Sequence, residues 1–154
     1  MTEVSVAFQE DTKYRGHVLP SGNDVFTPQR VVIHEVNSEW AKSAKIRLDS
    51  LVSLKPGWDG YQGIPVSFNL AYLALLVIDR LYQEGVPKPD IIPGSDGTLQ
   101  IEWHVNGYDV EVDVLAANNI VASRFSRGRG VDEQVELKAD LSCVWQWISE
   151  LRLS

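Results

Sequence analysis

The sequence is poor in cysteine, in basic residues and in long apolar runs, and each scarcity excludes a class of protein. A single cysteine among 154 residues excludes an intramolecular disulfide framework and any multi-cysteine zinc or iron–sulfur site. The 14 Lys and Arg against 21 Asp and Glu leave a net charge of −7, which argues against direct binding to nucleic acid, because such affinity comes from neutralised phosphates. No apolar run reaches the ~18 residues of a membrane span, and the polar, acidic N-terminus is atypical of a signal peptide. We therefore expect a cytoplasmic protein with no membrane contact and with a basic partner.

What the chain does contain is ordinary for a globular protein. Hydrophobic residues make up 44% of it and charged residues 23%. We expect a single domain over residues 1–154, with residues 1–30 as a loosely ordered N-terminal segment. The predicted fold class is α+β, in which an antiparallel meander sheet of three to four strands is packed on one face by about three helices.

Three helices are predicted from capping residues and apolar spacing. Ser38 and Ser67 are the expected N-caps of the first two, and the second, apolar almost all round, is expected to run to Gly85. Asp140 is the expected cap of the third. Residues i and i+2 project from different sides of a helix, so Trp145 and Trp147 cannot both face the core. The expected apolar stripe of that helix is Leu141, Val144, Trp145, Ile148 and Leu151.

A β-hairpin is the clearest strand signal, because Asn106-Gly107 favours a two-residue type I′ turn. With this turn at the tip, one face of the hairpin is apolar and the other is polar. A slip of one residue would turn every apolar side chain outward, so the alternation predicts the register. The apolar pairs are Val105–Tyr108, Trp103–Val110, Ile101–Val112 and Leu99–Val114, and the polar pairs are His104–Asp109, Glu102–Glu111 and Gln100–Asp113.

Further strands are predicted on both sides of this hairpin. Segment 120–127 is expected to follow as the third strand of the meander, and QVELK at 134–138 as the fourth. VVIH at 31–34 is a separate strand prediction, whereas the proline-rich stretch from Val86 to Thr98 is expected to be an extended approach to the hairpin. The expected pairs of the third strand are Leu115–Ile120, Val114–Val121, Val110–Phe125 and Glu111–Arg124.

The polar face of the predicted sheet is the strongest candidate site. No Lys or Arg occurs between Lys88 and Arg124, and Glu102 lies opposite Glu111, a like-charge pair that destabilises a sheet. Three interpretations stay open: a solvated face with Arg124 as its counter-charge, a binding surface for a basic protein, or a site for a hard cation such as Mg²⁺. The binding surface would use Glu102, Asp109, Glu111 and Asp113, and the cation site Glu102, His104, Glu111 and Asp113.

A second candidate is the glycine-rich segment around Trp58 and Tyr61, between the first two helices. It is either a structural turn, in which Asp59 bonds nearby amides and the aromatic rings cover the helix ends, or an exposed aromatic platform that anchors a ligand. No nucleophile motif or phosphate-binding loop accompanies either candidate, so no catalytic residue and no cofactor are assigned.

Two motifs taken together carry a family resemblance. LKPGWDGYQGIPVS at 54–67, followed by PKPDIIPGSDGTLQIEW at 87–103, resembles a pattern shared by a group of small bacterial and mobile-element proteins. The chain departs from that pattern at Gln62 and at Gly63-Ile64. The resemblance implies a bacterial, plasmid or phage-related accessory protein, and it supplies no catalytic residues.

The leading hypothesis is a non-enzymatic protein-binding module, antitoxin-like or an anti-defence inhibitor. It would bind a basic protein surface through Glu102, Asp109, Glu111 and Asp113, with Trp58 and Tyr61 as anchors. The first alternative is a metal-dependent hydrolase that uses the carboxylates and His104 of the same face. The second is a self-associating module that forms a homodimer through whichever of Trp145 and Trp147 is exposed.

Overall fold

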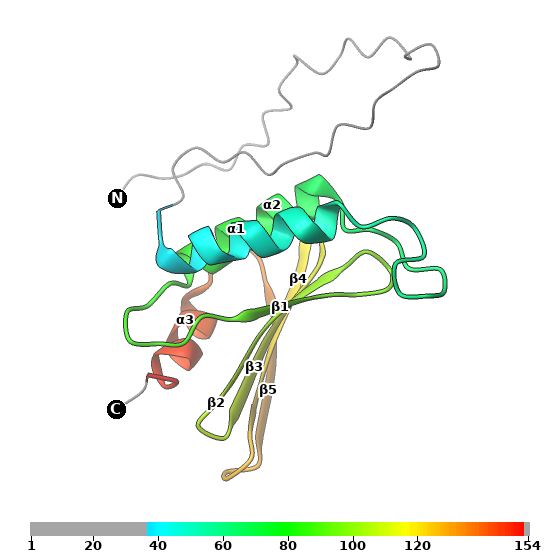
Figure 1. Cartoon of the computed structure of the whole chain (residues 1–154). Coiled ribbons are helices and arrows are strands. Elements are labelled where there is room, and N and C mark those ends of the chain that lie inside the picture. The colour runs from blue at the N-terminus through cyan, green and yellow to red at the C-terminus, as the bar shows by residue number, and fades with distance from the viewer. Residues whose placement is uncertain (1–36, 153–154) are drawn as a thin grey trace, which may run out of the picture.

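Three helices pack on one face of a five-stranded antiparallel sheet (Figure 1). The computed structural model describes residues 37–152. The α+β prediction is confirmed, with one strand more than expected. The predicted strand at 31–34 lies outside the described residues. In chain order the elements are α1 (Glu39–Val52), α2 (Phe68–Arg80), β1 (Asp90–Pro93), β2 (Leu99–Val105), β3 (Tyr108–Ala116), β4 (Asn119–Ser126), β5 (Val131–Leu137) and α3 (Ser142–Ser149).

The first two helices begin where their capping residues predict. The Ser38 hydroxyl accepts the amide of Ala41 at 3.2 Å, and the Ser67 hydroxyl accepts that of Leu70 at 3.2 Å. The prediction that α2 runs to Gly85 was wrong, because the helix ends at Arg80. Turns follow, and Gly85 adopts its positive φ there rather than in a helix cap. None of the helices in the described part of the chain has the length and apolar composition needed to cross a bilayer.

The core lies between the helix layer and the inner face of the sheet. Alternate residues of β2 and β3 project into it and are fully buried, as the hairpin pattern predicted. Trp103 packs against Trp40 of α1 with ring centroids 5.8 Å apart, and its indole N–H donates to the Pro87 carbonyl at 3.1 Å. Trp40 in turn contacts the edge of Tyr82 at 5.4 Å. These aromatic contacts hold α1 and the approach to β1 against the sheet.

The proline-rich segment before the hairpin forms β1, which the sequence analysis left unpaired. Its four residues pair with β2, from Asp90 opposite Glu102 to Pro93 opposite Leu99. Prolines are compatible with a strand at the edge of a sheet, because their missing N–H can face away from the neighbour. The prolines therefore made β1 hard to predict as a strand, and they are tolerated there because β1 lies at the edge of the sheet.

The register of the β2–β3 hairpin is confirmed for all seven predicted pairs, from Val105–Tyr108 to Leu99–Val114. Asn106 and Gly107 have φ values of 54° and 78°, the positive angles that a type I′ turn requires.

The predicted register between β3 and β4 was wrong by one residue. Val114 lies opposite Ile120 instead of Val121, and an irregularity between Val114 and Ala116 places one extra residue, Leu115, in β3. The shift reverses every side chain of β4 relative to the prediction. Arg124 therefore pairs with Val110 on the helix-covered side and not with Glu111, and Phe125 pairs with Asp109 on the opposite side and not with Val110.

The last strand and helix also differ from the prediction in detail. β5 begins at Val131, three residues before the predicted start, and ends at Leu137. Leu141 is the N-cap of α3, although the Asp140 carboxylate still accepts the amide of Ser142 at 2.8 Å. Trp147 faces the core with 7% of its surface exposed, whereas Trp145, predicted to lie on the apolar stripe, is 45% exposed. Trp147 lies three residues after Val144, on the face that the helical period directs inward.

Candidate partner-binding face

The side of the sheet opposite α1, α2 and α3, called the open face here, is strongly acidic. The pairings of the strands determine its membership, because side chains alternate between the two sides. Among the described residues its cationic groups are His104 and, from the loop after β4, Arg127. Its carboxylates are Asp90, Glu102, Asp109, Glu111, Asp113, Asp132 and Glu136.

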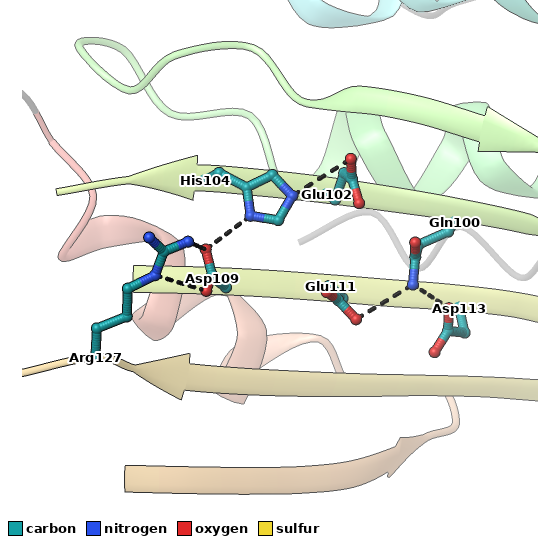
Figure 2. Close-up of polar contacts among 7 residues, drawn as sticks. All are labelled: Gln100, Glu102, His104, Asp109, Glu111, Asp113 and Arg127. Atoms are coloured by element: carbon teal, nitrogen blue, oxygen red, sulfur yellow. Dashed lines mark hydrogen bonds and ion pairs between the residues drawn. The ribbon is translucent and has the colours of Figure 1, made fainter. Parts of the chain in front are cut away.

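Glu111 lies at the centre of this charge. It is directly opposite Glu102, and the Gln100 amide donates both to Glu111, at 3.2 Å, and to Asp113, at 3.0 Å (Figure 2). Partial burial raises the pKa of the Glu111 carboxyl, and the charges of Asp113 and Glu102 add to that rise. The amide of Gln100 is neutral, so it separates two carboxylates without cancelling their charge.

His104 lies between two carboxylates nearer the hairpin tip (Figure 2). Its Nδ1 is 2.7 Å from an Asp109 oxygen and its Nε2 is 3.3 Å from Glu102. The hydrogen bond to Asp109 is the main reason that the pKa of His104 is raised, and the same bond lowers the pKa of Asp109. Arg127 adds a second cation to Asp109, at 3.3 Å. The predicted His104–Asp109 pair is therefore confirmed, and it neutralises only this end of the open face.

Arg124 is not a counter-charge for this face. Its guanidinium points to the other side of the sheet, where it donates to both carboxylate oxygens of Glu150 and lies 4.9 Å from the centroid of the Tyr108 ring. Within residues 37–152, no Lys or Arg pairs with Glu102, Glu111 or Asp113. The interpretation that used Arg124 to balance the open face was therefore wrong, because it depended on the incorrect β4 register.

The cation-site interpretation finds no converging ligands. Between Asn37 and Arg152 no group of three or more His, Cys, Asp or Glu side chains is placed to hold one metal ion. Figure 2 shows the reason: Gln100 lies between Glu111 and Asp113, while Glu102 and Asp109 both turn toward His104. The carboxylates thus divide between two different neighbours, Gln100 and His104, and the four predicted ligands do not point to one centre.

The glycine-rich segment with Trp58 and Tyr61 belongs to the loop between α1 and α2 and not to the open face. The Asp59 carboxylate accepts the amides of Tyr61 and Gly63, both at 2.9 Å, and the Trp58 indole donates to the Ile64 carbonyl at 3.2 Å. These bonds are those of a structural turn. Tyr61 is 88% exposed, so its side chain packs little against the described chain and is available to a partner.

Sequence reasoning missed the apolar side chains of the open face. Phe125 is 43% exposed and lies beside Asp109, and Ile92 of β1 is 41% exposed beside Gln100. It also missed Asp132 and Glu136, which extend the acidic surface across β5. The alternation of β5, with its acidic residues at 132 and 136, was a usable signal, but the predicted strand began at Gln134 and left Asp132 out.

No protein-family model, curated protein or solved structure matches the chain. The geometry and charge of the open face are therefore the features that bear on its function.

Proposed function

We propose that this protein is a non-enzymatic binding module whose open face docks on a basic surface of another protein. An antitoxin-like or anti-defence inhibitor of cytoplasmic location would work in this way, by occupying a surface that its target uses for nucleic acid. The observation that carries the proposal is the crowding of Glu111 with Glu102 and Asp113, with no Lys or Arg paired to any of them in residues 37–152.

This crowding costs stability in the free protein, because like charges directly opposite one another destabilise a sheet. A basic partner would convert the same arrangement into an attraction. Complementary charge also steers the encounter and raises the rate of association. The exposed ring of Phe125 supplies an apolar anchor of the kind that contributes most to binding energy when a partner covers it.

The test is a double charge reversal, Glu111→Lys with Asp113→Lys, in the full chain. The matched control is Glu39→Lys with Glu84→Lys, which changes the net charge equally at two exposed positions away from the sheet. Tagged wild-type protein and both variants are used in pull-downs from the native cell at low and at high salt, and circular dichroism verifies that each variant is folded.

We expect the wild type and the control to retain one stoichiometric basic partner at low salt, and the open-face variant to lose it. High salt should release the partner from all of them, because screening weakens exposed charge pairs. Retention of the same partner by the open-face variant would contradict the proposal, as would the recovery of a partner-free monomer in every case.

A second candidate is the self-associating module, which the exposed indole of Trp145 favours. Sedimentation of the wild type and of Trp145→Ala would test it. A dimer that dissociates in the variant would support self-association through α3, and a monomeric wild type would exclude it.

A further inference from the structure

The two edges of the sheet differ in how many free backbone groups they offer. The meander order makes β1 and β5 the edge strands. An unprotected edge presents unpaired N–H and C=O groups that another chain can bind as an added strand, and proteins usually block such edges.

The β1 edge is blocked. The amide of Gly94 donates to the carbonyl of Thr98 on the β2 side, so by alternation Pro93, Ile91 and Pro89 turn their backbone groups outward. The two prolines have no N–H, and the Ile91 carbonyl accepts the Arg47 side chain at 3.2 Å. Lys88 also reaches across to Ser43 of α1, at 3.2 Å. The outward positions 89–93 of β1 therefore offer a single backbone donor, that of Ile91.

Among the described residues, none covers the β5 edge. In a two-residue hairpin the closing pair exchanges its hydrogen bonds, so Tyr108 faces β2, Asp109 faces β4, and the alternation continues across the sheet. The backbone groups of Arg124, and of every second residue of β4 counted from it, then bond to those of Glu133 and of every second residue of β5. The remaining backbone groups turn to the free side, and they belong to Asp132, Gln134 and Glu136.

Nothing in residues 37–152 covers these groups. No backbone or side-chain hydrogen bond reaches the N–H or C=O groups of Asp132, Gln134 or Glu136 from outside the sheet, and all three side chains are exposed. The strand contains no proline, in contrast to β1. It also has the length of an ordinary strand, so it offers a regular template for pairing.

The charge of β5 selects its occupant. The strand carries Asp132, Glu133 and Glu136 and has no Lys or Arg. Two copies of β5 paired about Gln134 would place Asp132 of one copy opposite Glu136 of the other, a like-charge contact that disfavours self-pairing. An extended segment with Lys or Arg at alternate positions would instead place its cations beside these carboxylates and continue the open face.

We propose that β5 binds an extended basic segment of the partner as a sixth strand of the sheet, with the basic side chains of that segment on the open face. The inference rests on the proposed function for the basic character of the partner and adds the mode of binding. Backbone hydrogen bonds of β5 would supply affinity, and the alternate carboxylates would supply specificity.

The test uses a labelled seven-residue peptide of alternating arginine and threonine. Two further versions of this peptide are methylated on their backbone nitrogens, one at the odd residues and the other at the even residues. All three peptides have the same charge, so their affinities differ only if the peptide binds as a strand. The protein is the full chain as wild type, as Gln134→Pro, and as the matched control Gln134→Ala. Proline at this position removes an outward N–H and leaves the bonds to β4 in place.

We expect Gln134→Pro to bind the unmethylated peptide about tenfold more weakly than Gln134→Ala, which is the effect of one lost backbone hydrogen bond. One methylated peptide should bind about tenfold more weakly than the other. In the wild type, peptide binding should also slow hydrogen exchange at the amides of Asp132, Gln134 and Glu136, a readout that does not depend on the proline variant folding.

Equal binding by both Gln134 variants and by both methylated peptides, with unchanged exchange at these amides, would overturn strand addition. If Glu111→Lys with Asp113→Lys still abolished peptide binding in that case, the proposed function would survive without it. Both proposals would be overturned if the wild type did not bind the unmethylated peptide, or if none of the variants weakened that binding. If the wild type were a dimer that Gln134→Pro dissociates, the occupant of the β5 edge would be a second copy of the chain, and the proposal of a basic segment would be overturned.

Discussion

Arg124 of β4 and Glu150, which follows α3, form a two-pronged ion pair that holds the C-terminal helix against the sheet. The Arg124 Nη1 is 3.3 Å from one Glu150 oxygen and Nη2 bonds the other, while the arginine side chain is 11% exposed and the glutamate 46%. The Nε of Arg124 is buried and has no hydrogen-bond partner within residues 37–152. The pair thus keeps a mostly buried cation satisfied on two of its three nitrogens.

Removal of Glu150 should destabilise the protein more than replacement of the arginine. Within residues 37–152, Glu150→Ala leaves a buried guanidinium with the distant Glu133 as its one carboxylate, and we expect it to lower the free energy of unfolding by about 1–3 kcal/mol. Arg124→Met removes the buried charge and retains volume, so we expect a smaller loss. Urea unfolding of both single variants and the double variant measures the coupling, and a larger loss in Arg124→Met would contradict this account.

Phe125→Ala tests the β4 register directly. Because the ring lies on the open face and is 43% exposed, its truncation should cost less than about 1 kcal/mol of stability, whereas the register predicted from sequence would bury the ring and cost roughly 3–5 kcal/mol. We expect the same variant to weaken partner binding, since the ring is the proposed apolar anchor. Thermal unfolding and a binding titration provide the two measurements.

Glu111→Gln should stabilise the free protein. The pKa of Glu111 is raised above 4.5, so the folded state favours the protonated carboxyl, and stability falls as pH rises through that range. The amide variant removes this penalty while it can still accept the Gln100 hydrogen bond. We expect it to gain roughly a few tenths of a kcal/mol at neutral pH and to match the wild type at low pH. Glu84→Gln, a neutralisation away from the sheet, should show no such pH-dependent gain.

Stability should also fall with rising pH through His104, but in a higher pH range. Its pKa is raised above 6.5, mainly by Asp109, so its stabilising contribution is present below 6.5 and is lost as pH rises through the folded pKa. Nuclear magnetic resonance titration of the imidazole should give a midpoint above 6.5 in the wild type and a lower one in Asp109→Asn. An unchanged midpoint in that variant would exclude the hydrogen bond as the cause.

Partner affinity should follow the same titration. Protonated His104 adds a positive charge to the open face, so binding of a basic partner should strengthen as pH rises through the His104 pKa. In His104→Gln this pH dependence should disappear, which a binding titration at several pH values would show.

Local chemistry made part of this structure predictable from sequence. The register of β2 and β3 follows from Asn106-Gly107 and from strict alternation on both strands, and the helix starts follow from Ser38 and Ser67. The acidic composition of β2 and β3 on the open face followed from the same register. These features need only residues that are close together in the chain.

The β4 register was not predictable, because both faces of that strand are mixed. Ile120, Ala122 and Arg124 alternate with Val121, Ser123 and Phe125, so neither alignment satisfies the hydrophobic pattern alone. The extra residue at Leu115 and the ion pair with Glu150 decide between them. Both are properties of the packed molecule.

The sequence by itself thus determined the α+β class, the central hairpin and the excess of carboxylates on its polar side, since periodicity and turn chemistry act over a few neighbouring residues. Only the tertiary structure decided that Arg124 turns away from those carboxylates, that Phe125 joins them, and that prolines close the β1 edge while no segment of residues 37–152 covers β5. Each of these depends on contacts between segments distant in the chain, where packing and charge burial outweigh local preference.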